Sequence, residues 1–181
     1  HPHDRHPRKG DCLMNPDSVQ HINVKVFATA NAESDAVVKV FHRWIKDTVC
    51  PELLIDVAEY SHVPEGPGVL LIAHEANYSL DNRDNRPGLL YNRKMADQGT
   101  FQEKLAQAHA SALAACDRLE KETTLRFDRN NLEVFVNDRL LAPNTEETWQ
   151  TLEPELRRYF KNAKIEKVGE PRDLFRVAIS T

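Results

Sequence analysis

A short stretch near the middle of the sequence gathers an imidazole, two carboxylates and a phenol. These four candidate catalytic residues are His74, Glu75, Tyr78 and Asp81. Imidazole and carboxylate groups are common metal ligands and common general acids and bases. Tyr78 stands where an H-E-x-x-H zinc motif carries its second histidine, so the pattern does not match that motif. A metal site would therefore need His42 or His62, delivered by the fold.

The same cluster also has an ordinary structural interpretation, which we favour. His74 and Tyr78 can make hydrogen bonds at a sheet edge while Glu75 is solvated. His62 lies in a proline- and glycine-rich loop that precedes the strand containing His74. A hairpin around this loop would place the two histidines at opposite ends of that strand. The candidate cluster is thus limited to the four residues above.

The loop from Asn82 to Lys94 is rich in hydrogen-bond donors. Its arginines Arg83, Arg86 and Arg93 are candidate anion-binding residues, because a guanidinium presents a bidentate fork to a carboxylate or phosphate. No glycine-rich phosphate loop is present, so nucleotide binding has no specific support. A plain turn explains the same composition, since Asn and Asp tolerate turn geometry.

Hydrophobic periodicity predicts the elements that position these residues. In residues 20–29, Ile22, Val24 and Val26 alternate with polar neighbours and predict a half-buried strand. Further strands are predicted at residues 53–57, at 69–73 with a continuation to Tyr78, at 89–91, at 132–141 as a hairpin with a tight turn, and at 174–179. A glycine- and proline-rich loop separates the second and third of these strands.

Three amphipathic helices complete the predicted order β-α-β-β-β-α-β-β-α-β. The first covers residues 34–49, the second begins with a capping box of Thr100 and Glu103, and the third is capped by Asn144. Pro154 lies inside the third pattern, so this helix is kinked there or begins near it. Because strands mostly follow strands, we expect an α+β fold with a mixed, largely antiparallel sheet and two layers.

Length and composition limit the classes of protein. The 181 residues suggest a flexible His- and Arg-rich tail over residues 1–18 and a single α+β domain over residues 19–181. The net charge of −4, with both signs interspersed, argues against nucleic-acid binding. No apolar run approaches the roughly 20 residues that span a bilayer. Three scattered cysteines without a C-x-x-C pair fit a reducing compartment, so we expect a cytoplasmic protein.

No pattern in the chain names a reaction, a metal or a cofactor, and two hypotheses follow. The first is a non-catalytic accessory or binding protein that uses the loop from Asn82 to Lys94 or an exposed sheet edge, such as the 132–141 hairpin. Its partner would be another protein, a second copy or a small anionic ligand.

The alternative is a small enzyme, metal-assisted or not, built on His74, Glu75, Tyr78 and Asp81. The enzyme requires these side chains to converge in a concave pocket. The binding protein requires an exposed apolar patch or edge. The absence of common catalytic signatures favours the first hypothesis.

Overall fold

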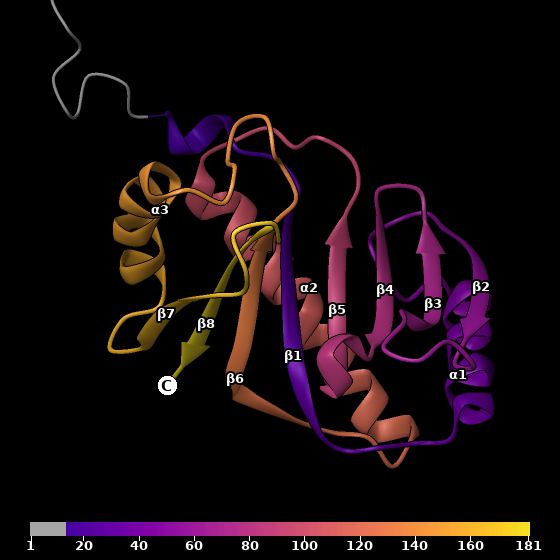
Figure 1. Cartoon of the computed structure of the whole chain (residues 1–181). Helices are drawn as coiled ribbons and strands as arrows, with labels where there is room; N and C mark the ends of the chain where they lie inside the picture. The colour runs from indigo at the N-terminus through magenta and orange to yellow at the C-terminus, as the bar shows by residue number, and fades with distance from the viewer. Residues whose placement is uncertain (1–13) are drawn as a thin grey trace, which may run out of the picture.

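The computed structural model describes residues 14–181, which form three α-helices and one eight-stranded sheet (Figure 1). The strands are β1 (Ile22–Ala30), β2 (Leu54–Tyr60), β3 (Gly68–Ala73), β4 (Ala76–Asp81), β5 (Gly88–Arg93), β6 (Arg126–Val136), β7 (Lys164–Val168) and β8 (Phe175–Ser180). The helices are α1 (Ser34–Asp47), α2 (Phe101–Glu122) and α3 (Glu146–Tyr159), with short 3-10 helices η1 (Pro16–Ser18) and η2 (Arg83–Asn85). The α+β class is confirmed.

The sheet has the order β2-β3-β4-β5-β1-β6-β8-β7, and every neighbouring pair is antiparallel. The strands β2 to β5 form a meander, and β1 joins it to the C-terminal strands. The edge strands are therefore β2 and β7. Within residues 14–181, no helix combines the length and apolar composition that crossing a membrane requires.

The helices pack against one face of the sheet, which we call the helix face; the opposite one is the open face. Figure 1 views the molecule from the open face, with the long helix α2 behind β5 and β1. In β1, Ile22, Val24 and Val26 belong to the core between sheet and helices, as their alternation predicts. Asn23 and Lys25 lie between them and point to the open face.

Local capping determines where the helices begin. The predicted box at α2 is present, since the Thr100 hydroxyl accepts the Glu103 N–H at 3.2 Å. Helix α3 is capped by Thr145 and not by Asn144, because the Thr145 hydroxyl accepts the Thr148 N–H. Pro154 lies inside α3, which runs through it to Tyr159.

The folded part of the chain includes residues that the sequence assigned to the tail. The Lys104 ammonium group donates to the carbonyl oxygens of Asp17 and Val19, at 2.6 and 3.0 Å. The Phe101 N–H donates to the Asp17 carboxylate at 2.8 Å, at the start of α2. Met14 packs against the core. The remainder of the predicted tail, residues 1–13, lies outside the described residues.

Two strand predictions are wrong. Residues 69–78 form two strands, β3 and β4, joined by a turn at His74 and Glu75 that contains neither glycine nor proline. Residues 132–141 are not a hairpin: β6 ends at Val136, and the chain continues as a loop. There the Asp138 carboxylate accepts the N–H groups of Gln20 and Leu141, which replaces the expected turn. Strand β7 was not predicted, because its residues are mostly charged.

Candidate functional site

The fold distributes the seven predicted site residues over three places. His74 and Glu75 form the turn between β3 and β4, where His74 is exposed. The Glu75 carboxylate accepts the Leu53 N–H at 2.9 Å, and this bond holds the pKa of Glu75 below its ordinary value. The His74 N–H donates to the Leu53 carbonyl at 2.8 Å. Both residues thus connect the turn to the chain that enters β2, while His62 lies at the opposite end of β3.

Tyr78 and Arg93 lie on the helix face, within a buried network. The hydroxyls of Tyr78 and Tyr91 each donate to the Glu52 carboxylate at 2.9 Å. Gln107 of α2 and the Arg93 guanidinium donate to the Tyr91 hydroxyl, at 2.9 and 3.4 Å. Burial raises the pKa of Tyr78 far above its ordinary value, so this phenol stays protonated. The network fastens α2 and the segment before β2 to the sheet.

Asp81 lies on the open face, because it is three positions from Tyr78 and side chains alternate along a strand. The four candidate catalytic side chains therefore point to a turn, to the helix face and to the open face. They do not converge in one pocket, as a shared catalytic site would require. The four residues are close in sequence, but the turn at His74 and the alternation of side chains along β4 separate them in space.

On the open face, Asp81 belongs to a layer of paired charges. The Lys25 ammonium group lies 2.7 Å from the Asp81 carboxylate, and the Lys25 side chain is only 3% exposed. Glu133 of β6, whose side chain is 5% exposed, accepts from Arg86 at 3.2 Å and lies 3.6 Å from the Arg176 guanidinium. Each of these buried charges thus has a partner from another strand or loop, as buried charges require.

The segment that contains η2 covers part of this layer. The Arg86 guanidinium stacks over the Phe27 ring, 3.9 Å from its centroid, and Asp84 pairs with Arg176 at 3.1 Å. Asp84 and Asn85 adopt left-handed backbone conformations, with φ of 60° and 54°. Asp and Asn adopt this conformation more readily than most residues, so the sequence suits the tight turn. Burial raises the pKa of Glu133 despite the neighbouring cations.

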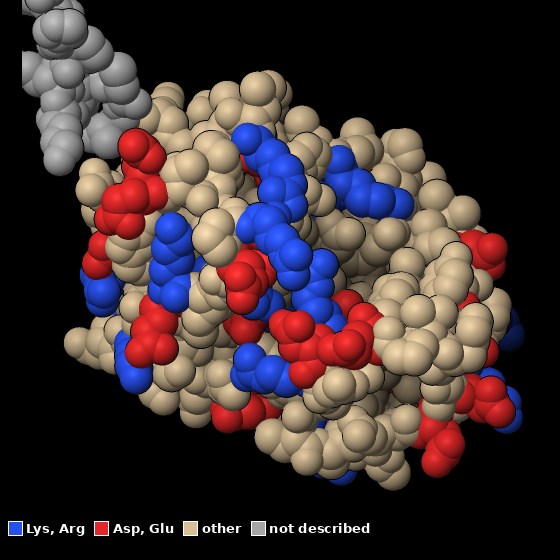
Figure 2. Space-filling model, in the orientation of Figure 1, with Lys and Arg blue, Asp and Glu red and all other residues tan. Residues whose placement is uncertain are grey.

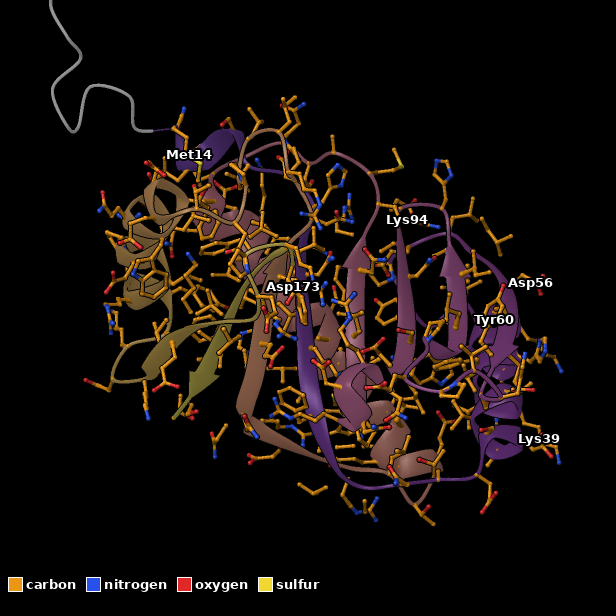
Figure 3. All side chains as sticks on the ribbon, viewed as in Figure 1. Met14, Lys39, Asp56, Tyr60, Lys94 and Asp173 are labelled. Atoms are coloured by element: carbon orange, nitrogen blue, oxygen red, sulfur yellow. The ribbon has the colours of Figure 1, made fainter. Side chains whose placement is uncertain are left out.

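Beside the charge layer lies a cavity of about 160 Å³, which we call the open-face pocket. It is lined by Asn23, Asp81, Arg83, Leu90, Asn92, Phe135, Asn137 and Leu174. Figure 2 shows this face of the molecule, with a band of Lys and Arg across its middle and acidic residues beside the band. Asp173, labelled in Figure 3, lies in this central region next to Leu174. The pocket thus joins an apolar wall to a charged rim.

Several polar groups of the open-face pocket make few bonds to the protein. Among residues 14–181, the Arg83 guanidinium and the side-chain amides of Asn92 and Asn137 have no hydrogen-bond partner, and the Asn23 amide has one, the Arg93 N–H at 2.8 Å. Arg83 shares with Asp173 only a longer-range attraction, which contributes to the lowered pKa of Asp173. Asn77, which pairs with Asn92 across the strands, has a buried side-chain oxygen without a partner in the described part of the chain. The pocket is therefore supplied with unused donors.

The sequence had indicated only part of this site. Asp81, Arg83 and Arg86 were candidates, whereas Arg93 lies on the other face. Lys25 was recognisable as a polar residue on the outer side of β1, and Glu133 as a charge inside an apolar strand. No local pattern in the sequence indicates that Phe135 and Leu174 line the same pocket, because the pairing of β6 with β8 places them there. Likewise, no local signal marked Glu52 as a buried carboxylate.

Metal binding finds no support in the geometry, because no three His, Cys, Asp or Glu side chains of residues 14–181 gather as metal ligands do. Comparison with protein-family models and with curated protein sequences finds no match to this chain.

Proposed function

We propose that this protein is a non-catalytic binding protein that holds a small anionic ligand in the open-face pocket. The observation that carries the proposal is the set of unpartnered donors there, from Arg83, Asn92 and Asn137. Arg83 and Asn137 are exposed and Asn92 is half-buried, so these donors are accessible to a ligand that enters the cavity. A guanidinium among them favours a carboxylate or a phosphate.

The rest of the pocket supports a ligand with an anionic end and a flat apolar body. Lys25 already neutralises Asp81, which leaves the Arg83 charge available to a ligand. Leu90, Phe135 and Leu174 supply an apolar wall. The volume of about 160 Å³ is below the range of pockets for drug-sized molecules, which begins at about 300 Å³. An aromatic carboxylate of the size of benzoate suits these dimensions.

The lining residues also favour binding over catalysis. Among the described residues, no histidine, cysteine, lysine or hydroxyl side chain lines the open-face pocket, so Asp81 is the one lining residue of a type that acts as a nucleophile or base. Its one carboxylate, on Asp81, is held by Lys25 and by the Arg83 N–H, at 2.7 and 3.2 Å. A general base would need a freer carboxylate.

The proposal is tested by isothermal titration calorimetry with benzoate, inorganic phosphate and benzamide. Benzoate should bind best, and benzamide, which has the same shape without the charge, should bind weakly. Arg83→Ala should weaken benzoate binding by about 10-fold or more, because a hydrogen bond to a charged group contributes about 1.5–3 kcal/mol.

Arg118→Ala is the matched control, since Arg118 is an exposed arginine of α2 on the helix side of the sheet. It should leave benzoate binding unchanged. Equal binding of benzoate and benzamide would contradict an anion site. Equal losses in the Arg83 and Arg118 variants would locate the binding elsewhere.

A further inference from the structure

The edge strand β2 exposes large apolar side chains at the margin of the sheet, and none of its residues lines the open-face pocket. Leu53, just before the strand, is 64% exposed, and Ile55 and Tyr60 are 56% and 44% exposed. Figure 3 labels Tyr60 and Asp56 on this outermost strand. A seven-residue strand with a free edge is a template on which another strand can form hydrogen bonds.

The opposite edge strand, β7, lacks these features. It has five residues, and its exposed side chains are Lys164, Glu166 and Lys167. Lys164 and Glu166 pair at 2.9 Å, while the apolar Ile165 is buried. A short strand with charges of both signs is a common protection against unwanted pairing. The two edges of the sheet therefore differ in their capacity to accept a partner.

The backbone of β2 has a donor that faces away from β3. The Val57 N–H donates to the carboxylate of the preceding Asp56 at 2.8 Å, so it is not used by the neighbouring strand. Just beyond the strand, the Ser61 N–H donates to Glu59 at 3.1 Å. Asp56 and Glu59 are exposed, and exposed hydrogen bonds to a carboxylate are displaced at small cost. An incoming carbonyl oxygen can take the place of the Asp56 carboxylate.

The charge of β2 determines which partner suits it. The strand contains two acidic residues, Asp56 and Glu59, and no basic residue. A second copy of the chain, paired edge to edge, would bring four carboxylates together with no cation on either strand. Like charges on neighbouring strands are destabilising, and opposite charges are stabilising. The margin therefore favours a basic partner over self-association.

We infer that β2 binds an extended peptide segment that carries lysine or arginine on both of its faces, by adding it as a ninth strand to the sheet. Asp56 and Glu59 are three positions apart and lie on opposite faces of β2, so cations on both faces of the peptide would pair with them, and its apolar side chains would cover Ile55 and Tyr60. Once displaced from the Val57 N–H, the Asp56 carboxylate becomes available for such a pair. Main-chain bonds supply the affinity in this mode of recognition, and side chains supply the selectivity.

Fluorescence anisotropy with a labelled peptide tests the inference on the full chain. The probe is a valine peptide with two lysines three positions apart and the length of β2, seven residues, and its counterpart replaces both lysines with glutamate. The lysine peptide should bind and the glutamate peptide should not. The charge-reversed variant Asp56→Lys/Glu59→Lys should lose affinity for the lysine peptide by about fivefold or more, since each cross-strand charge pair contributes up to about 1 kcal/mol.

The control is Glu166→Lys, which reverses the one carboxylate of the other edge strand, β7, whereas the β2 variant reverses two. It should leave binding of the lysine peptide unchanged, and melting curves should show both variants folded. Binding of both peptides alike, or equal losses in the β2 and β7 variants, would overturn the inference. Failure of the lysine peptide to bind, or a dimer seen by light scattering, would also overturn it. None of these outcomes depends on the open-face pocket.

Discussion

The two faces of the sheet differ in whether their polar side chains are hydrogen-bonded to other protein groups. On the helix face, polar side chains are few and bond to one another inside the core, as Glu52 does with two tyrosines. On the open face, charges from β1, β4, β6 and β8 pair across the strands, and further donors remain unused around a pocket. The same strands contribute to both faces, so the difference comes from what covers each face.

This comparison separates polar groups that serve the fold from those available to a ligand. A buried polar group without a partner destabilises the folded protein, so a closed core retains only groups that are paired. On a face that water reaches, an unpaired Arg83 or Asn92 costs little. The unpaired groups of the open face are therefore the candidates for binding, and the paired groups of the helix face are candidates for stability.

The largest effect is expected from the helix face. Glu52→Ala removes the acceptor of the Tyr78 and Tyr91 hydroxyls, and it should lower the free energy of unfolding by about 3 kcal/mol, since each buried donor left unpaired costs about 1–3 kcal/mol. Urea denaturation measures the change. Glu153→Ala, which removes an exposed ion pair with Arg157, is the control and should change stability by less than about 0.5 kcal/mol. A loss below about 1 kcal/mol for Glu52→Ala would show that water replaces the carboxylate.

On the open face, a smaller loss is expected when a buried pair is broken. Lys25→Met leaves Asp81 without its cation and should lower the free energy of unfolding by about 2 kcal/mol, less than in a deep core because the Asp81 side chain is 14% exposed. The double variant Lys25→Met/Asp81→Leu should recover at least half of this loss, because no lone charge remains. Urea denaturation measures the change. If the losses of the two single variants added up in the double variant, the two charges would not be coupled.

The stability of the protein should depend on pH through Glu133 of the open face. Because burial raises the pKa of Glu133 above its ordinary 4.5, the folded protein binds this proton more readily than the unfolded chain. Its contribution to stability is fully present below pH 4.5 and is lost as the pH rises through the raised pKa. From neutral pH toward 4.5, the wild type should therefore gain stability relative to Glu133→Gln, as urea denaturation at several pH values would measure. A relative loss would mean that Arg86 and Arg176 outweigh burial.

The smallest effect on stability is expected for the side chain that we assign to ligand binding. Arg83→Ala should change the free energy of unfolding by less than about 0.5 kcal/mol, because this exposed guanidinium has no partner in the described part of the chain. Thermal denaturation without ligand checks this. A clear loss of stability would instead make Arg83 part of the charge layer and would weaken the comparison between the faces.

Much of the fold could be predicted from local pattern. The alternation in β1 placed Val24 toward the core and Lys25 on the opposite side, and the capping box identified the start of α2. The turn at His74 was missed because its residues carry no turn signal and its bonds reach Leu53, in another part of the chain. The hairpin at 132–141 was predicted wrongly because Asn137 and Asp138 resemble a tight turn, whereas Asp138 bonds to Gln20.

The candidate site was predicted in its loop and in Asp81 of β4. The residue types of Arg83 and Arg86 indicated anion binding, and the structure places both beside the open face. Their neighbours Lys25, Phe135 and Arg176 come from strands separated by long stretches of sequence. A sequence pattern cannot reveal such neighbours, because they depend on which strands pair and in which register.

By itself, the sequence determined the α+β class, the helix boundaries to within a few residues and the side of β1 that faces the core. These properties depend on neighbours a few positions apart, which periodicity and capping describe. Only the tertiary structure decided that Tyr78 and Asp81 lie on opposite faces of one strand, and that Asp81 meets Lys25 while Tyr78 meets Glu52. Tyr78 and Asp81 are only three positions apart, but successive side chains of a strand point to opposite sides of the sheet. Their partners Glu52 and Lys25 therefore lie on opposite faces.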